Sequence, residues 1–564
     1  MRGSRLRFAS IATVFGLVLV AAAHAQVPEP PWFSWSTVAN NNDSIPGVEG
    51  RTFNSYNAPS INAFGLVVFR ARSRGGPPLG PATHGIYARD MSGDGGPIVM
   101  ILDRSSPVPP PNNLGTLFVE TPSFPRIDMW SDTVATRGNH QPVWTYTVGG
   151  LETRAGTTGV YTNPYGDLIT GASKLGAVPG FSFFEVPEEP GTFFDVFPGA
   201  PAATDRTTIV FKGNYTVGGA AKTGVYYREL DDAAAGGDAP VVLVANTDTA
   251  IPGTTTLFGS VSPPTAVGRT AVFAGFDDEA RPSVGGLYLA PLSGTLPPLT
   301  ALVSIGQRVP GEGVPRTFAV LGEGAAFDGR FVAFWGAWGD ETRTVRLYCP
   351  QEGNKDRIDY CNQRLVCATT GEIVGDPRST CDDETDPNYP VCYQERQVPV
   401  EQGIFTLDLE TGRLRTVAKT GARFVEFLFW NYSGRVPCIG ATHGGEGGEE
   451  DGEAARWRSS AFMAVAGQGD EWPYTAFKAA TGDATGVYLG RWPGQAAFTV
   501  LDSRTPGPWV DLHAPAGSMV TEVGLEREGL RGTRLVLNAR MGVPGGTEEE
   551  GMAGIYLTFL PPMP

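Results

Sequence analysis

The sequence predicts an all-β protein, a seven-bladed β-propeller, and three observations carry this prediction. Short runs of Val, Ile, Phe and Tyr are bounded by Gly, Pro, Asn and Asp in a chain with 74 Gly and 47 Pro, which is typical of many short strands joined by turns. One supersecondary unit recurs seven times. The two ends of the chain each supply part of one unit. Repeated groups of four antiparallel strands are the pattern of propeller blades.

Each repeat contains a Gly-aliphatic-aromatic triplet that opens a strand, here called strand C. The triplets begin at Gly85, Gly159, Gly224, Gly286, Gly403, Gly486 and Gly554. Strand B precedes the triplet and follows a tight turn ending in Arg, as in Gly268-Arg269 or Gly434-Arg435. Strand D follows it and ends at an aliphatic-Pro-Gly turn, because Pro cannot donate to a strand ladder. A Phe then opens strand A of the next blade.

The chain ends predict how the ring closes. The C-terminal part supplies strands A, B and C of blade seven, with strand C near residues 555–559, and no strand D follows. The N-terminal part begins with an isolated strand D at residues 36–40, followed by its own Ile-Pro-Gly turn. We expect this strand to complete blade seven, because pairing would hide two edges that otherwise promote aggregation.

The Val-x-Phe strand, the Gly-Ile-Tyr strand and the Val-Pro-Gly turn together resemble the tandem repeats of secreted bacterial proteins of unknown function, some of which carry interchangeable C-terminal anchors. The repeat is also similar, more loosely, to the TolB-type propeller repeat, although it lacks that family's Ser-Pro-Asp-Gly turn. The resemblance covers nearly all of residues 32–560. It implies a propeller fold and no particular activity, since propellers host binding, scaffolding and several chemistries.

Residues 1–25 have the features of an export signal. Arg2, Arg5 and Arg7 precede an apolar segment that is too short to span a bilayer comfortably, and Ala23-His24-Ala25 fits a cleavage site. No later apolar run is long enough for a membrane helix. We therefore expect residues 26–564 to form a single propeller domain, released as a monomer into a periplasm or the medium.

Loss of the three signal arginines leaves a net charge of −19. A chain this acidic repels nucleic acid and anionic membrane surfaces, so cations or partners with basic patches are better candidates. The plainer interpretation is that the charge keeps a secreted protein soluble.

Two insertions are expected in the B–C loops of neighbouring blades and hence on one face. They are residues 336–402 in blade five, which are Cys-rich, and residues 443–485 in blade six, which are acidic and Gly-rich. Loops of this length in a compact fold are functional or disordered, so the insertion face is the predicted binding surface for a protein or glycan partner.

Export favours disulfides in an insertion with little core of its own. The candidates are Cys349, Cys361, Cys367, Cys381 and Cys392, together with Cys438, which the repeat pattern places in strand B of blade six. Five cysteines cannot pair completely, so either Cys438 ties the insertion to its neighbour or two thiols stay free. Six cysteines allow 15 connectivities, and spacing alone leaves them open. Zinc is disfavoured, since no ligand pair at zinc spacing occurs.

An acidic group within the first insertion could hold Ca²⁺, which takes hard oxygen ligands. Its residues are Asp382, Asp383, Glu384 and Asp386. They complete no known calcium motif, and a solvated acidic loop is the plainer interpretation. No other cofactor is expected.

The four histidines after the signal, His84, His140, His443 and His513, all fall in B–C or D–A loops and therefore on one face. His84, His140 and Tyr161 are candidate acids or bases, and Arg137 could neutralise a carboxylate. His443 and His513 are candidate binding residues. Loops hold most polar residues in any case, so shared placement does not require a shared site.

Complete catalytic motifs are missing: there is no Gly-x-Ser-x-Gly elbow, no His-Glu-x-x-His helix and no phosphate-binding Gly loop. The sequence therefore favours a non-catalytic binding or scaffold module over an enzyme. The alternative is a secreted polysaccharide-processing enzyme, lyase-like and acting on acidic glycans, because some polysaccharide lyases share the seven-bladed form.

Overall fold

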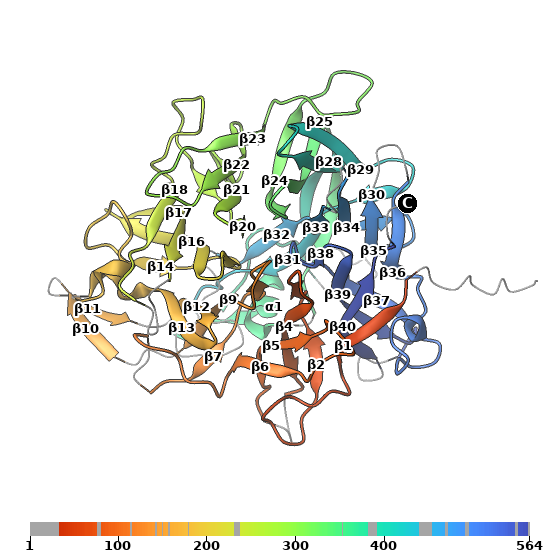
Figure 1. Ribbon diagram of the computed structural model, residues 1–564, viewed down its shortest axis with the longest axis horizontal. Helices are drawn as coiled ribbons and strands as arrows, with labels where there is room; N and C mark the ends of the chain where they lie inside the picture. The colour runs from red at the N-terminus through yellow and green to blue at the C-terminus, as the bar shows by residue number, and fades with distance from the viewer. Residues whose placement is uncertain are drawn as a thin grey trace, which may run out of the picture. The chain divides into compact units, whose positions relative to one another are not determined.

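The structure is a computed structural model that describes residues 33–561. Within this range it leaves out residues 76–79, 113–114, 141–143, 149–150, 156–157, 179, 231–236, 352, 382–391, 439–453, 468–471, 491–495 and 547–550. In this part of the chain seven antiparallel blade sheets form a ring, which confirms the seven-bladed β-propeller (Figure 1). The expected export signal lies outside the described residues. Among the described residues, no helix is long and apolar enough to cross a membrane.

Strands C and D follow the repeat pattern of the sequence, and strand B follows it in every blade except blade six. Strand B of blades one to seven is β4 (Leu66–Ser73), β9 (Val134–His140), β16 (Thr208–Val217), β21 (Thr270–Phe276), β25 (Phe331–Tyr348), β34 (Tyr474–Thr481) and β39 (Arg534–Gly542). Strand C is β5 (His84–Asp90), β12 (Thr158–Tyr165), β17 (Ala220–Glu229), β22 (Gly285–Pro291), β28 (Tyr393–Asp408), β35 (Thr485–Gly490) and β40 (Met552–Phe559). Strand D is β6 (Val99–Asp103), β13 (Asp167–Ser173), β18 (Val242–Asn246), β23 (Thr300–Ser304), β29 (Arg413–Lys419), β36 (Phe498–Asp502) and β1 (Trp35–Asn40).

Strand A is broken into two pieces in six of the blades described. The first pieces are β2 (Phe53–Tyr56), β7 (Phe118–Glu120), β14 (Phe194–Val196), β19 (Ser260–Val261), β30 (Phe424–Glu426) and β37 (Met519–Gly524). The second pieces are β3 (Ser60–Ile61), β8 (Arg126–Ile127), β15 (Ala202–Thr204), β20 (Thr265–Val267), β33 (Met463–Ala466) and β38 (Leu530–Arg531), and blade five has one irregular strand, β24 (Phe318–Phe327). These second pieces and β24 contact each other in ring order and surround the central channel.

Shorter elements fill the connections. The described B–C connection of blade two carries the hairpin β10 (Trp144–Val148) and β11 (Leu151–Ala155). Three short 3-10 helices are η1 (Lys174–Ala177), η2 (Ser182–Phe184) and η3 (Gly507–Trp509).

The repeat triplet is explained by how three strands pack within a blade. In blade three the ring of Phe194 in strand A meets Tyr226 in strand C edge-on, with centroids 4.9 Å apart. A Cβ on Gly213 of strand B would lie 2.5 Å from Phe194, and a Cβ on Gly224 would lie 2.6 Å from the Tyr226 hydroxyl. Each ring therefore lies directly over a glycine, and a larger residue in that position would displace it.

The blades are held together by apolar cores, one between each pair of neighbours. The core between blades one and seven joins Val38, Val536 and Ile555 to Phe53 and Ile61, all of them buried. Complete burial of such side chains stabilises the fold by about 1.5–3 kcal/mol each. The place where the ring closes, here called the seam, therefore has the same kind of core as the other interfaces between blades.

Strand β1 pairs antiparallel with β40, from Trp35 with Thr558 to Asn40 with Gly554, so the predicted closure is confirmed. A buried carboxylate adds to the seam. Asp511 accepts hydrogen bonds from the Asn40 amide at 2.7 Å and from the Tyr556 hydroxyl at 3.0 Å. One side chain of the D–A connection thus links the first and last strands of the ring.

The expected position of strand B in blade six is wrong. Strand B is β34, and the Gly434-Arg435 turn belongs to an inserted hairpin, β31 (Phe429–Ser433) paired with β32 (Arg456–Ser460). This hairpin interrupts strand A between β30 and β33, and the actual B–C turn is short. Residues 463–466 and 474–481 of the expected 443–485 insertion are blade strands, and Cys438 lies in the connection of the hairpin. A Gly-Arg turn looks alike in a blade and in a hairpin, so local sequence could not separate the two.

We expect deletion of residues 26–48 to lower the melting temperature and to cause self-association, because the deletion removes the core at the seam and exposes the edge of β40. Differential scanning calorimetry and light scattering measure both effects. A synthetic peptide of residues 33–48 should restore the melting temperature in a concentration-dependent way. A truncated protein that stays monomeric with an unchanged melting temperature would contradict this account of closure.

We expect Gly224→Ala to lower the free energy of unfolding by about 1–3 kcal/mol, because the added methyl group overlaps the Tyr226 ring. The midpoint of guanidinium unfolding measures it. Gly313→Ala is the matched control, since nothing lies within 4 Å of a Cβ at that position. Equal stability of the two variants would show that the ring does not depend on the glycine.

Candidate functional site

Strands β25 and β28 of blade five continue past the blade as a two-stranded arm, paired from Thr342 with Pro399 to Tyr348 with Tyr393. The register shifts where the arm leaves the blade, and Gly339 adopts a φ of +76° there. A Cβ at Gly339 would lie 2.2 Å from the Glu401 carboxylate. The positive φ therefore favours glycine at this bend, and a side chain there would also displace the Glu401 carboxylate.

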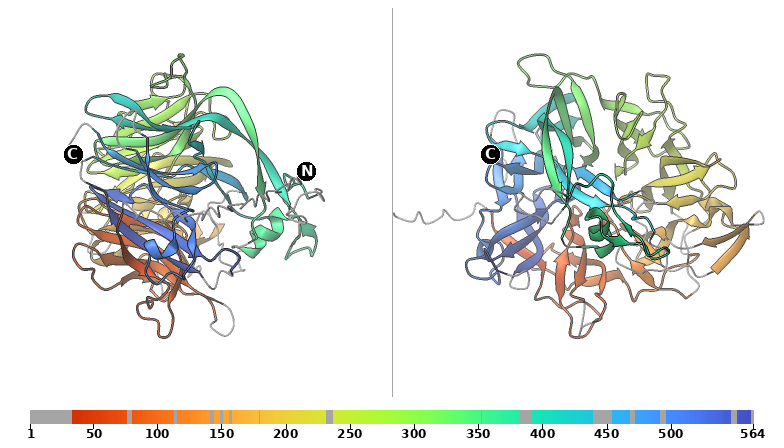
Figure 2. Two further views of the ribbon diagram at one scale, coloured as in Figure 1. Left: turned by 90° about the vertical axis from the view of Figure 1, so that its right-hand side faces the viewer. Right: turned by 180° about the vertical axis from the view of Figure 1, so that it is seen from behind.

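The arm carries a small tip at its end (Figure 2). The tip contains α1 (Lys355–Cys361), whose N-cap Asn354 accepts a hydrogen bond from the Arg357 N–H, and the short strands β26 (Leu365–Val366) and β27 (Ile373–Val374). Disulfides join Cys349 to Cys361 and Cys381 to Cys392. Both disulfides lie within the first insertion, and they agree with an oxidising compartment.

The tip packs on the inserted hairpin of blade six. Their shared core contains Cys361 and Leu365 from the tip and Tyr432, Val436 and Ala455 from the hairpin. We call this unit, formed by residues 342–399 together with β31 and β32, the cap.

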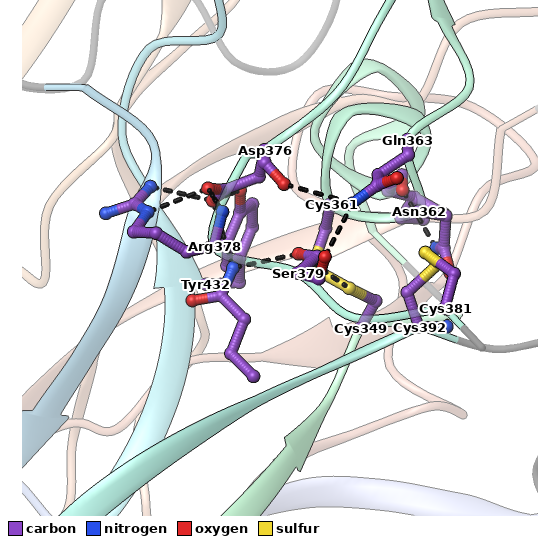
Figure 3. Close-up of a disulfide and its surroundings, with 12 residues drawn as sticks. Cys349, Cys361, Asn362, Gln363, Asp376, Arg378, Ser379, Cys381, Cys392 and Tyr432 are labelled. Atoms are coloured by element: carbon purple, nitrogen blue, oxygen red, sulfur yellow. Dashed lines mark hydrogen bonds and ion pairs between the residues drawn. A yellow bond between two sulfur atoms is a disulfide. The ribbon is translucent and has the colours of Figure 1, made fainter. Parts of the chain in front are cut away.

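A buried carboxylate, Asp376, joins the two halves of the cap (Figure 3). It receives two hydrogen bonds of 2.7 Å from Arg378 and one of 2.7 Å from the Tyr432 hydroxyl. Burial opposes ionisation of Asp376, but these hydrogen bonds outweigh it and hold its pKa below the usual value. Arg357 adds a bond of 3.0 Å to the Gly434 carbonyl in the hairpin connection. The cap is thus an internally bonded unit.

A cavity of about 700 Å³ lies between the cap and the central channel. Thr342, Gln397 and Trp430 line it from the cap, and the breaks in the A strands line it from the ring. Its charged lining residues are Glu279, Glu323, Glu526 and Arg527. A contact between Glu279 of blade four and Arg456 of β32 ties the cap to the ring. This partly open, partly apolar space with a few convergent polar groups has the features of a binding site.

A buried ion pair lies in the channel near this cavity, next to the lining residues Ala200 and Arg527. Arg126 of blade two donates to Glu528 of blade seven, with Nε 2.9 Å from Oε1, and to Thr265 of blade four at 2.9 Å. Both charged side chains are at most 2% exposed. Because one guanidinium bonds to blades on different sides of the channel, it crosses the channel between its two mouths.

The four candidate catalytic residues are buried in blades one and two, each at most 5% exposed. His140 pairs with Phe118 of β7, and a backbone group of Val119 hydrogen bonds His84, so the two histidines flank one strand. Burial and the charge of Arg70 lower the pKa of His84 to about 3, so its imidazole is uncharged at neutral pH. Tyr161 and Arg137 lie in β12 and β9.

The tyrosine of the candidate set has a clear packing role. Tyr161 is the aromatic residue of the blade-two triplet, meets Phe118 edge-on at 4.8 Å and accepts a hydrogen bond from Asn112. Burial raises its pKa. Contact with a substrate would require these groups to become accessible.

The other candidates are spread over the chain. His513 is exposed in the D–A connection before blade seven, with Nδ1 3.2 Å from the buried Asp511. His443 lies outside the described residues, as do Asp382, Asp383, Glu384 and Asp386. Among the described residues no group of three or more His, Cys, Asp and Glu side chains could hold a metal ion.

The residues that line the cavity, and the ion pair of Arg126 with Glu528, were not predicted from the sequence. They are isolated polar residues in strand breaks, and their meeting depends on ring closure. The run Glu526-Arg527-Glu528 was the one available signal, because three consecutive charges are unusual in a segment that must approach the channel.

No family model and no curated protein sequence matches this chain. Among solved structures, an oligogalacturonate lyase in complex with manganese aligns over 94% of this chain and 97% of its own, with 9% identity and a TM-score of 0.37. A Trypanosoma rangeli sialidase aligns over 82% of this chain and 60% of its own, with 12% identity and a TM-score of 0.34. Such likeness concerns the propeller fold and assigns neither activity to this chain. The repeat family that the sequence resembles stays a prediction.

Two thiols meet where the tip and the hairpin connection touch. Cys367 and Cys438 are free, and a hydrogen bond from Cys438, followed by one from Thr369, lowers the pKa of Cys367 to about 6. We expect oxidised glutathione to convert the pair to a third disulfide, since the Cys367 thiolate is the reactive form. The two thiols lose two protons and two electrons, and glutathione disulfide becomes two glutathione thiols.

A non-reducing peptide map should then show the Cys367 peptide linked to the Cys438 peptide. This link should slow proteolysis of the cap, because a disulfide stabilises the folded state by about 2–4 kcal/mol. Cys438→Ser is the control and should leave Cys367 unpaired. Recovery of both thiols as alkylated, unlinked peptides after oxidation would contradict the contact.

Proposed function

We propose that this chain is an exported, non-catalytic binding module whose partner occupies the cavity beneath the cap. The observation that carries the proposal is the convergence of two insertions, from neighbouring blades, in one disulfide-stapled cap over a cavity of about 700 Å³. Loops in such a position serve recognition on many rigid scaffolds. The cap is bonded before any partner arrives, so little ordering entropy opposes binding.

Charge supports a cationic partner. The whole chain carries a net charge of −16, and the cavity lining has three glutamates and one arginine. Two of these glutamates already have arginine partners. Long-range attraction therefore contributes mainly to the association rate and to partner selection. The cationic group that we expect is an amine. Either a basic protein segment or an amino-glycan can present it.

The lyase-like alternative has no separate observation in its favour. It would need a base that reaches the substrate, and the side chains of His84, His140 and Tyr161 are buried. It stays a prediction, as do the secreted location and the monomeric state.

Isothermal titration with an oligolysine peptide and with chitosan oligosaccharides tests the proposal and separates the two sources of amine. We expect binding of at least one probe, weakened about tenfold by Trp430→Ala, which corresponds to 1.4 kcal/mol. Ile373→Ala is the matched control, because Ile373 is an exposed apolar residue of the cap that does not line the cavity.

Deletion of residues 345–395 provides the second arm of this test. Thr344 and Gln397 are paired neighbours, so a short turn can rejoin the arm, and the propeller should stay folded without the tip. Binding of the amine probe should then be weakened, because the deletion removes the core that holds the hairpin carrying Trp430 in place. Full binding by the deletion variant, or no binding of either probe by the intact protein, would overturn the proposal.

A further inference from the structure

A second cavity, of about 620 Å³, opens at the other mouth of the channel, where the A–B turns of blades one to four meet the C–D turn of blade two. None of its lining residues belongs to the cap. The ion pair of Arg126 with Glu528 crosses the channel between the two cavities. The second cavity is therefore a site of its own.

Three aromatic side chains stand at this cavity. Phe64 and Trp130 occupy neighbouring A–B turns and are 55% and 61% exposed, with their rings 6.4 Å apart. Tyr165 lies in the C–D turn of blade two, 44% exposed, and its hydroxyl donates to the Leu230 carbonyl. Large exposed aromatic side chains around one cavity lose little conformational entropy on binding and offer a large contact area.

The repeat supplies its own comparison. The equivalent turns of blades three, four and five carry Asp205-Arg206, Gly268-Arg269 and Gly329-Arg330. These connections are shorter, yet they join strands A and B without an aromatic side chain, so the pairing of the two strands does not require Phe64 or Trp130. Their presence in two adjacent turns is a departure from the repeat that folding does not explain.

Buried side chains hold these turns in place. The buried Asp128 accepts hydrogen bonds from the Trp130 N–H at 3.3 Å and from the Arg206 N–H at 2.9 Å. The buried Asn62 accepts from the Phe64 N–H at 3.0 Å and donates to Asp132 at 3.1 Å. The turns of blades one, two and three are thus bonded to each other, and the aromatic rings project from a preorganised surface.

Charged groups of both signs lie beside the aromatic rings. Asp132, Asp205 and Arg206 line the same cavity, and Asn163 adds an amide. A sugar ring matches this combination, because its C–H face packs on an aromatic ring while its hydroxyls exchange hydrogen bonds with carboxylate, guanidinium and amide groups. A purely apolar partner would leave these charges without hydrogen bonds, which is costly.

We propose that this cavity binds a neutral carbohydrate chain, with sugar rings packed on Trp130 and Phe64 and hydroxyls bonded to Asp132 and Arg206. The site is independent of the proposed function, since it lies at the opposite mouth of the channel and shares no residue with the cap.

Native gel electrophoresis in gels containing xyloglucan, galactomannan, mixed-linkage β-glucan or dextran tests the proposal. We expect at least one polysaccharide to retard the intact protein. Trp130→Ala should raise the dissociation constant about tenfold or more, Phe64→Ala should raise it less, and Trp130→Phe should restore part of the binding. An unchanged melting temperature of each variant would confirm that folding is intact.

Phe498→Ala is the matched control, because Phe498 is an aromatic residue of similar exposure that lines neither cavity. Deletion of residues 345–395 should leave the retardation unchanged, which separates this site from the cap. Retardation by none of the four polysaccharides, or equal retardation of the intact protein and Trp130→Ala, would overturn the proposal.

Discussion

Blades one to six depend on an aromatic ring at strand A set edge-on against the aromatic ring of strand C, over a strand B that leaves room for both. The pairs Phe118 with Tyr161 and Phe318 with Phe405 repeat the geometry of blade three, at 4.8 and 4.9 Å. Edge-to-face packing is directional, so it fixes both the order and the register of the strands. Blade seven replaces the strand A ring with other apolar residues, and there Tyr556 instead bonds to the carboxylate of Asp511.

This contact is local in sequence, which explains why the ring itself could be predicted. In blades one to four the glycine, the aromatic residue and the preceding Phe lie within a few dozen residues, and they recur in blades five and six, where the insertions separate them further. The same reliance on local signals failed in blade six. The hairpin β31–β32 carries a Gly-Arg turn like those of the blades, and only pairing between β33 and β34 across residues 463–477 identifies the strands correctly.

The candidate sites could be predicted less well, because their residues meet through the ring rather than along the chain. Arg126 and Glu528 are 402 positions apart, and neither belongs to a motif. Their burial together stabilises only if both are present, since removal of one partner leaves an uncompensated charge. Histidine, by contrast, was an unreliable guide: His84 and His140 serve as parts of the packed interface between two blades, and His513 lies at the surface.

Closure at the seam also makes the fold sensitive to the completeness of the chain. Of the ring's strands, β1 is synthesised first, and its partner β40 is synthesised last. Asn40 hydrogen bonds to Asp511, which is 471 positions later in the chain, and Thr558 donates to the Ser34 carbonyl, which is 524 positions earlier. Contacts of this separation form late in folding, and until then the unpaired edges stay available to chaperones and proteases. A prematurely terminated chain lacks β40 and cannot pair it with β1, so the edge of β1 stays exposed and marks the molecule as incomplete.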